Sequence, residues 1–193
     1  VLSEEPAFNL DVKYAGETVA SKLARIREEM KEAGTNVHVV STIDDICWTL
    51  NIRGNDIDFF PLVLSYGIIT MDSFELYIDE KKLDDKLKAK LAKDGVNLHP
   101  YNDIYEDVKK FGSDVVAMID PGKLNYALFN NIPENVKTVE KRNPAILMKA
   151  IKNPVEIENI RKAQIKDSVA HVRFMKWLKA VSYTHLRAHE TRR

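Results

Sequence analysis

The sequence predicts an α/β fold in which helices flank a mixed β-sheet. Short runs of β-branched and apolar residues alternate along the chain with amphipathic helical patterns, an order typical of a sheet covered by helices. One tight turn, Met71-Asp72-Ser73, joins two such runs directly and predicts an antiparallel hairpin, so the sheet should contain both kinds of pairing. A much longer helical pattern over residues 153–180 predicts a final helix that stands apart from this sheet.

The first half of the chain predicts two helices and three strands. Apolar residues at helical spacing predict a helix over residues 17–33, which Gly34 ends in a left-handed conformation. Thr42 and Asp45 mark the start of a shorter helix that runs through Leu50. The predicted strands cover residues 37–40, 62–70 and 74–78.

The second half continues this alternation and contains no internal repeat. Leu83, Leu87 and Leu91 share one face of a predicted helix that ends near Gly95. The predicted helices cover residues 83–93, 102–111 and 121–129, and the predicted strands cover residues 96–99, 115–119 and, at an edge, 136–139. Residues 143–153 are predicted to connect this α/β part to the final helix.

The final helix carries a strong start signal and a long apolar stripe. Asn153 is the predicted N-cap, Pro154 takes the first helical position, and Glu156 is placed to complete a capping box. The stripe consists of Ile157, Ile160, Ile165, Val169, Val172, Met175 and Leu178. A helix of this length presents more apolar surface than one small domain covers, so we expect it to open a further domain.

Residues 181–193 break the pattern of the preceding helix. The stripe ends after Ala180 without a Gly or Pro stop signal. The DNA string GTC TCT TAT ACA CAT CTC CGA GCC CAC GAG encodes Val181 to Glu190 and resembles a transposon-end adapter used in sequencing libraries, so we interpret this segment as an adapter-derived artefact. His185 and His189 could share a helix face as metal ligands, but two ligands without a third are weak evidence.

We therefore expect four segments: an interdomain linker over residues 1–15, an α/β domain over 16–142, a linker with the first helix of a truncated domain over 143–180, and the artefact over 181–193. Residues 2–13 show no clear periodicity, and the chain starts at Val1 rather than Met, which indicates an internal piece of a longer protein.

Composition argues against several classes of partner. Lys plus Arg equals Asp plus Glu at 29 each, so no overall charge favours nucleic acid or anionic lipid. No apolar stretch reaches the roughly 20 residues that span a bilayer. Cys47 is the single cysteine, which excludes an internal disulfide and agrees with a reducing, cytoplasmic location. Because it lies in the apolar run Ile46-Cys47-Trp48, burial is a better interpretation than nucleophilic catalysis.

The loop Arg53-Gly54-Asn55-Asp56 is the strongest candidate for a functional site. It places a glycine beside three side chains that can bind carboxylates or amides, between a predicted helix and a buried strand. The alternative is a structural turn, in which Gly54 takes positive φ, Asn55 or Asp56 caps the backbone and Arg53 pairs locally. Both interpretations stay open on the residues alone.

Other polar residues have simpler explanations. His99 has no partner that the sequence identifies, and His38 and His171 have still less support as catalytic groups. Asp44 and Asp45 are explained by capping and by the helix dipole. The charged segment 79–93 is most simply a solvated face. No phosphate-binding loop, nucleophile elbow or complete metal-binding constellation precedes residue 181.

Several motifs occur in an order that resembles one family. They are Asp44 to Asp56, Pro61 to Tyr66, His99-Pro100-Tyr101, and Lys149 to Ala163 followed by Ile165-Lys166-Asp167. Together they resemble the middle domain and the following junction of the long, three-domain Xaa-Pro aminopeptidases (aminopeptidase P), relatives of creatinase and prolidase. The resemblance covers nearly all of residues 1–180.

The resemblance implies a creatinase-type N-terminal domain, which is ribonuclease H-like, followed by the first helix of a pita-bread metallopeptidase domain. Members of the family release an N-terminal residue before proline, using two divalent metal ions, commonly manganese, held by two Asp, one His and two Glu. All five ligands would lie beyond Ala180, so we expect no catalytic residue, no metal ligand and no cofactor in this chain, and no peptidase activity from it alone.

For this chain the resemblance places Arg53 and Asn55 as candidates at the substrate entrance. The implied partner is a peptide with proline at its second position, and a homo-oligomer is compatible with the family. The alternative is a non-catalytic α/β binding or interaction domain that keeps the same fold, because fold alone does not fix function.

Overall fold

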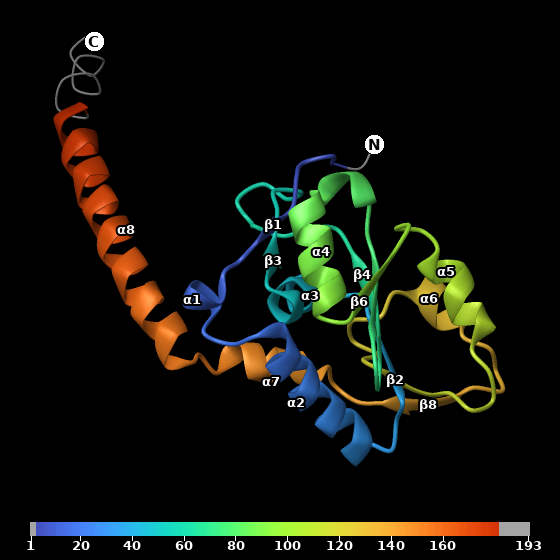
Figure 1. Cartoon of the computed structure of the whole chain (residues 1–193). Helices are drawn as coiled ribbons and strands as arrows, with labels where there is room; N and C mark the ends of the chain where they lie inside the picture. Colours follow the sequence, from blue (N-terminus) through green and yellow to red (C-terminus); the bar gives the residue numbers. More distant parts are fainter. Residues whose placement is uncertain (1–2, 182–193) are drawn as a thin grey trace, which may run out of the picture. The chain divides into compact units, whose positions relative to one another are not determined.

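The computed structural model describes residues 3–181, and the chain divides between Lys152 and Asn153 into two compact units (Figure 1). The part before Asn153 is called the α/β unit below, and the part from Asn153 onward is called the helix unit. Each unit is described by itself.

A six-stranded mixed sheet forms the centre of the α/β unit, in the order β6-β5-β4-β2-β7-β8. The strands are β2 (Val37–Val40), β4 (Tyr66–Thr70), β5 (Phe74–Tyr77), β6 (Val96–His99), β7 (Val116–Ile119) and β8 (Lys137–Glu140). β4 runs antiparallel to both β2 and β5, whereas the pairs β5/β6, β2/β7 and β7/β8 are parallel. The predicted mixed sheet is confirmed, including the hairpin that joins β4 to β5.

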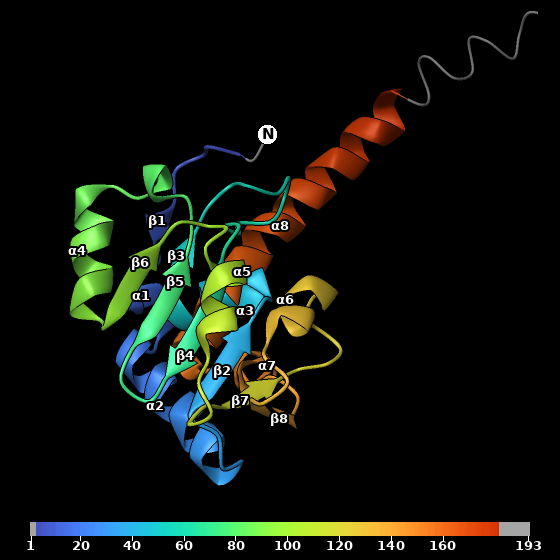
Figure 2. The same cartoon turned by 90° about the vertical axis from the view of Figure 1, so that its right-hand side faces the viewer.

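Helices cover both faces of this sheet, and each face has its own apolar core (Figure 2). The helical elements of the unit are α1 (Val12–Ala15), α2 (Val19–Glu32), α3 (Ile43–Leu50), η1 (Glu80–Lys82), α4 (Asp85–Lys93), α5 (Ile104–Asp107), η2 (Val108–Lys110), α6 (Tyr126–Asn131) and α7 (Pro144–Ala150). Residues from α2, α3, α4 and α7 fill one core, and residues from α5, η2 and α6 fill the other. Ile68 and Ile69 are neighbours on β4 and enter opposite cores, as the two-residue period of a strand requires.

Close approach between strands fixes a glycine in the hairpin. A Cβ on Gly67 would lie 2.6 Å from Cζ of Phe74, whose ring is fully buried. Gly34 instead has a φ of 67° just after α2, which confirms its predicted left-handed conformation.

The structure differs from the predicted elements in three connections. Residues 143–153 contain α7, because the Asn143 side chain caps it through the Ala145 amide at 3.0 Å and Pro144 fits the first helical turn. Residues 62–65 precede β4 rather than belonging to it, since the amide of Leu64 bonds to the Asp56 carboxylate instead of a neighbouring strand. α6 begins at Tyr126, where Asn125 supplies the cap.

The predicted aperiodic start of the chain also forms structure. β1 (Phe8–Asn9) pairs antiparallel with β3 (Ile52–Arg53) in a separate two-stranded sheet, and α1 follows directly. The amide of Ala7 donates to the carbonyl of Lys82 at 2.9 Å. Strands of two residues are too short to show an alternating pattern in the sequence.

The helix unit is a single described helix, α8 (Pro154–Val181). The predicted capping box is confirmed: the Asn153 amide donates to the Glu156 carboxylate and the Glu156 amide donates to the Asn153 side chain, both at 2.9 Å. No residue of α8 is buried. His185 and His189 lie outside the described residues, and no helix in the described part of the chain is long and apolar enough to cross a membrane.

Candidate functional site

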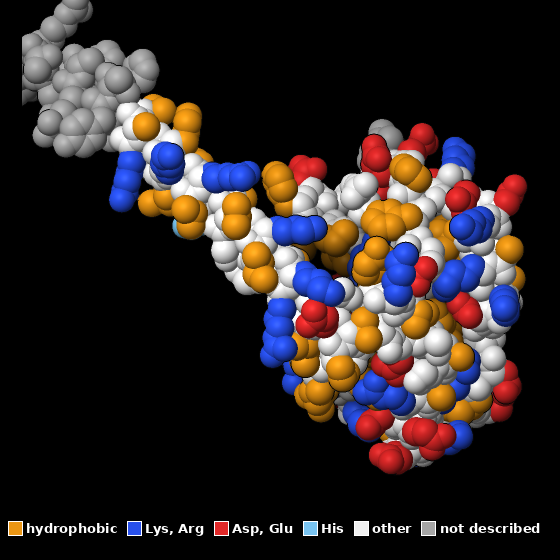
Figure 3. Space-filling model, turned by 60° about the vertical axis from the view of Figure 1, so that its left-hand side comes forward, with side chains coloured by type: hydrophobic (Ala, Val, Ile, Leu, Met, Phe, Trp, Pro, Cys, Tyr) orange, Lys and Arg blue, Asp and Glu red, His pale blue; other side chains and the backbone are white. Residues whose placement is uncertain are grey.

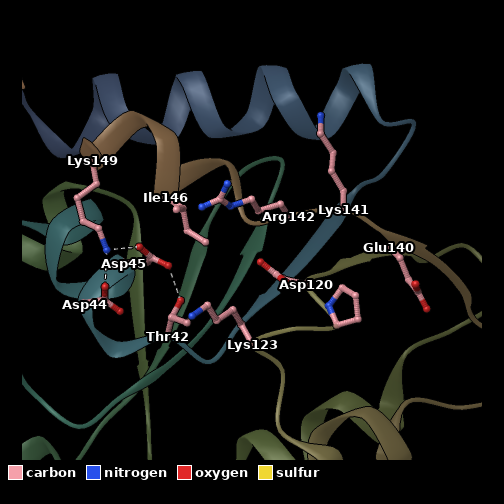
Figure 4. Close-up of a pocket in the computed structure, with 11 residues that line it drawn as sticks. Thr42, Asp44, Asp45, Asp120, Lys123, Glu140, Lys141, Arg142, Ile146 and Lys149 are labelled. Atoms are coloured by element: carbon pink, nitrogen blue, oxygen red, sulfur yellow. Dashed lines mark hydrogen bonds and ion pairs between the residues drawn. The ribbon is translucent and has the colours of Figure 1, made fainter. Parts of the chain in front are cut away.

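A charged pocket lies where the three parallel strands β2, β7 and β8 end (Figure 4). Ligands of open α/β sheets commonly bind at the carboxyl ends of such strands. The pocket has a volume of about 530 Å³, and its lining comes from the start of α3, the loops after β7 and β8, and α7. The lining residues are Thr42, Asp44, Asp45, Asp120, Pro121, Lys123, Glu140, Lys141, Arg142, Ile146 and Lys149.

Asp45 is the most constrained acid of the pocket, with 2 % of its side chain exposed. Its carboxylate accepts hydrogen bonds from the Thr42 hydroxyl at 2.6 Å, from the Asn143 amide at 2.9 Å and from the Lys149 ammonium at 2.6 Å. These three donors come from the start of α3 and from α7 and its cap, so the carboxylate joins the two helices. Burial of this charge is tolerated because it is paired and hydrogen-bonded.

Lys149 also pairs with the more exposed Asp44, as Figure 4 shows. Partial burial acts to raise the pKa of Asp44, but the hydrogen bond and charge of Lys149 outweigh it and hold that pKa below its usual value. For Lys149 itself burial acts to lower the pKa, and the two carboxylates raise it above the usual value. Both acids lie in the first turn of α3, where the helix dipole favours them, and Asp45 in addition bonds to side chains, which the expected capping role did not include.

Two of the other charged residues of the pocket bond to the structure around it. Asp120 accepts hydrogen bonds from the backbone amides of Gly122 and Asn143, and Lys141 pairs with Glu29 at 2.8 Å. Four acids face four bases in the lining, so its formal charge is balanced. Among residues 3–181, no group of three or more His, Cys, Asp or Glu is arranged to hold a metal ion. The arrangement is that of a polar, structurally stabilised hollow.

His38 extends this network into the buried interior. Its Nδ1 lies 3.0 Å from the Met118 carbonyl, and its Nε2 lies 3.3 Å from Oδ1 of Asn143, so both ring nitrogens face acceptors. The Asn143 orientation is fixed by the Ala145 amide on Oδ1 and the Asp45 carboxylate on the amide group. Complete burial lowers the pKa of His38, although both acceptors and the nearby Asp45 and Asp120 favour its charged form.

The predicted Arg53 loop lies at the other end of α3 from this pocket. Nη1 of Arg53 donates to the carbonyls of Cys47 and Ile52, both at 2.8 Å. Gly54 does not take positive φ; it is required because a Cβ there would lie 2.5 Å from Cγ2 of Val63. The expected φ in the structural-turn interpretation is therefore wrong, whereas its local pairing of Arg53 is present.

A buried ion pair anchors the same loop. Asp56 and Lys82 are each 1 % exposed at the side chain, and Nζ lies 2.5 Å from Oδ2. The same oxygen accepts the Leu64 amide at 2.7 Å, which is the predicted capping of the backbone. Burial of Lys82 corrects the expectation that segment 79–93 is only a solvated face. Sequence alone gave no signal for this pair, because a lysine in a charged run is usually exposed.

Exposed residues lie within the loop and directly after it. Asn55 is exposed, and Phe59 is fully exposed with a φ of 67°, which is rare for a bulky residue. Phe60 follows it with most of its side chain exposed. The structure thus places the two predicted entrance residues shortly before an exposed pair of aromatic residues.

His99 and Cys47 both have structural roles in the α/β unit. His99 bonds through Nε2 to the Glu75 carboxylate at 2.6 Å and stacks on Tyr77, which is a partner that sequence reasoning could not identify. Cys47 is buried, as predicted, and accepts the Val63 amide at 3.4 Å. Burial raises the pKa of its thiol, which keeps it protonated and unreactive.

The mixed sheet with helices on both faces and a pocket at its parallel strand ends defines an open α/β domain. The family model described as the Creatinase/Prolidase N-terminal domain matches residues 1–156. The chain belongs to this family.

Curated relatives and solved structures extend the comparison. The chain is 36% identical over 183 residues to a probable Xaa-Pro aminopeptidase P of Neurospora crassa, covering 90% of this chain and 27% of the relative. It is 40% identical over 174 residues to Xaa-Pro aminopeptidase 1 of Dictyostelium discoideum, covering 89% and 27%. It therefore spans less than a third of the length of these relatives.

Among solved structures, the X-prolyl aminopeptidase of Caenorhabditis elegans superposes with a TM-score of 0.88 at 31% identity, covering 94% of this chain and 30% of that one. That protein is described as a cytosolic enzyme with a di-nuclear active site. An Xaa-Pro dipeptidase of Bacillus anthracis shares the fold, with a TM-score of 0.60 at 16% identity over 82% of this chain and 44% of its own.

Replacing Asp45 tests the network that joins α3 to α7. Asp45→Asn removes the charge that three donors share, so we expect the free energy of unfolding to fall by about 1–3 kcal/mol in urea denaturation. Asp44→Asn is the matched control: its side chain is 53% exposed, and its loss should cost less than about 1 kcal/mol. Equal effects of the two variants would contradict the central role of Asp45.

The buried His38 predicts an acid-dependent loss of stability. Its lowered folded pKa means that below about pH 6.5 the unfolded chain binds a proton more readily than the folded chain. The contribution is present above that pH and is lost as pH falls toward the folded pKa, by up to about 1.4 kcal/mol per pH unit.

Urea denaturation at a series of pH values measures this slope. His38→Asn should flatten it, while His171→Gln, on the exposed surface of α8, should leave it unchanged. A slope that survives in His38→Asn assigns the acid sensitivity to other groups.

Proposed function

We propose that this chain is a domain of a longer, metal-dependent aminopeptidase that releases the N-terminal residue before proline. The observation that carries the proposal is the similarity to the C. elegans X-prolyl aminopeptidase, which extends over 94% of this chain at 31% identity. Family membership and the curated Xaa-Pro aminopeptidases support the same parent activity. The substrate would be a peptide with proline at its second position.

The proposal assigns catalysis to a part of the parent outside this chain. The di-nuclear active site of the C. elegans protein supports two metal ions in the parent, and we propose manganese as the ion. The described residues do not fit such a centre, because they contain no cluster of metal-ligating groups.

In this scheme residues 1–15 link to a preceding domain, residues 16–142 form the α/β domain, and residues 143–180 lead into the catalytic domain. A cytoplasmic location follows the cytosolic description of the same relative.

Arg53 and Asn55 are our candidates for residues at the substrate entrance. The guanidinium is held by two backbone carbonyls, so its position is set before a peptide arrives. The buried ion pair between Asp56 and Lys82 holds the end of the same loop in place. A fixed guanidinium can bind a peptide carboxylate or carbonyl, and one placed at an entrance would limit access to short peptides.

The parent activity is tested by comparing this chain with its natural continuation. The chain alone, supplied with manganese, should not hydrolyse a proline-containing peptide, whereas the chain extended through its natural reading frame should. Mass spectrometry of the released N-terminal residue measures both. Hydrolysis by the chain alone contradicts the assignment of catalysis to a part outside this chain. An extended protein that is inactive and lacks metal-ligating residues in the added part favours a non-catalytic binding domain.

The entrance role of Arg53 is tested in the extended enzyme. Arg53→Ala should raise kcat/KM for long peptides relative to short ones by about tenfold, equivalent to about 1.4 kcal/mol of discrimination. Arg25→Ala is the matched control, since Arg25 lies on α2 with 47% of its side chain exposed and pairs with Glu17, which precedes that helix. Unchanged kinetics of Arg53→Ala across peptide lengths exclude the entrance role while leaving the parent activity intact.

A further inference from the structure

Lys82 is buried, although lysine usually lies at the surface of a protein. Charged side chains of both signs cover the face of the α/β unit that Figure 3 shows, which is the ordinary place for lysine. Lys82, in η1, has 1 % of its side chain exposed, and its ammonium lies 2.5 Å from Oδ2 of Asp56, the last residue of the Arg53 loop. Burying an ammonium is costly unless it is paired and hydrogen-bonded, so Lys82 and Asp56 fix each other's positions.

The side chain of Lys82 holds the end of the loop through this ion pair. The Asp56 oxygen that pairs with Lys82 also accepts the Leu64 amide at 2.7 Å. The Asp56 amide donates to the Leu62 carbonyl at 3.2 Å. Asp56 is therefore held against two separate parts of the chain, η1 and the segment that leads into β4.

The backbone of Lys82 holds the start of the loop through the N-terminal segment. Its carbonyl accepts the Ala7 amide at 2.9 Å. β1 begins at the next residue and pairs with β3, so that Phe8 lies opposite Arg53; the two strands lie side by side in Figure 1. Lys82 and Arg53 are therefore joined through only two residues, Ala7 and Phe8.

We propose that Lys82 is a positioning residue for Arg53 and Asn55, because it holds both ends of their loop at once. This inference rests on the proposed function, in which these two residues lie at the substrate entrance, and it adds the contacts that set their position. A short loop with both ends fixed has little conformational freedom left to lose when its guanidinium binds a peptide. All of these contacts lie within the α/β unit, so they can be tested in this chain.

Hydrogen exchange in the 193-residue chain tests the positioning directly. Asp56→Asn combined with Lys82→Met removes the ion pair and leaves no unpaired buried charge, so the fold should persist. The introduced amide oxygen can still accept the Leu64 amide. The amides of Gly54 and residue 56, which donate to the Pro61 and Leu62 carbonyls, should exchange at least about tenfold faster when measured by NMR. Unchanged exchange at both amides overturns the proposal.

Two controls separate loop positioning from a general loss of stability. The amides of β4, a strand paired on both sides, should keep their exchange rates in the double variant. Lys81→Met is the matched variant, since the Lys81 side chain is 76% exposed and its ammonium lies 3.9 Å from Glu4. It should leave exchange in the Arg53 loop unchanged. Equal acceleration in β4 and the loop, or equal effects of Lys81→Met and the double variant, contradicts a specific role of Lys82.

Kinetics of the extended enzyme test whether Lys82 acts through Arg53. The Asp56→Asn, Lys82→Met variant should lower the discrimination between short and long peptides by about tenfold, and adding Arg53→Ala should lower it no further. Additive effects, or an effect of Arg53→Ala that the double variant does not reproduce, contradict the link to the entrance. If Arg53→Ala itself leaves discrimination unchanged while the double variant speeds exchange in the loop, the entrance role fails and the positioning of the loop by Lys82 stands.

Discussion

The Asn143 side chain joins parts of the α/β unit that are far apart in sequence. Its amide donates to Asp45 at the start of α3, its oxygen accepts the Ala145 amide at the start of α7, and the same oxygen faces His38 on β2. Its backbone amide bonds to Asp120 after β7. One buried residue therefore sets the relative positions of two strands and two helices.

This arrangement closes one side of the pocket. The ends of parallel strands leave a gap between their loops, and polar contacts rather than apolar packing close its sides. Such a network is stable only when its members satisfy one another, because a buried polar group without a partner is costly. The second buried pair, Asp56 with Lys82, follows the same rule only in part, since Oδ1 of Asp56 has no hydrogen-bond partner among the described residues.

Local signals in the sequence predicted much of the fold and little of the site. The hairpin between β4 and β5, the end of α2 at Gly34 and the capping box of α8 depend on residues a few positions apart, and all three are present. The contact of Asp45 with Asn143 spans 98 residues, and no local pattern encodes it. Lys22 shows the same limit: within an amphipathic helix it is buried, and its ammonium bonds to the Trp48 carbonyl and Asn51 at the end of α3.

The buried thiol of Cys47 has a practical consequence for measuring this molecule. The chain contains one cysteine, and its sulfur is enclosed by the core of the α/β unit. Reagents that label thiols in water react with exposed thiolates, so they should react very little with the buried Cys47 of the folded chain. A spectroscopic probe attached through an introduced cysteine would consequently report from one known position. Two such probes, one on each unit, would turn the separation between the α/β unit and α8 into a distance that spectroscopy can measure in solution.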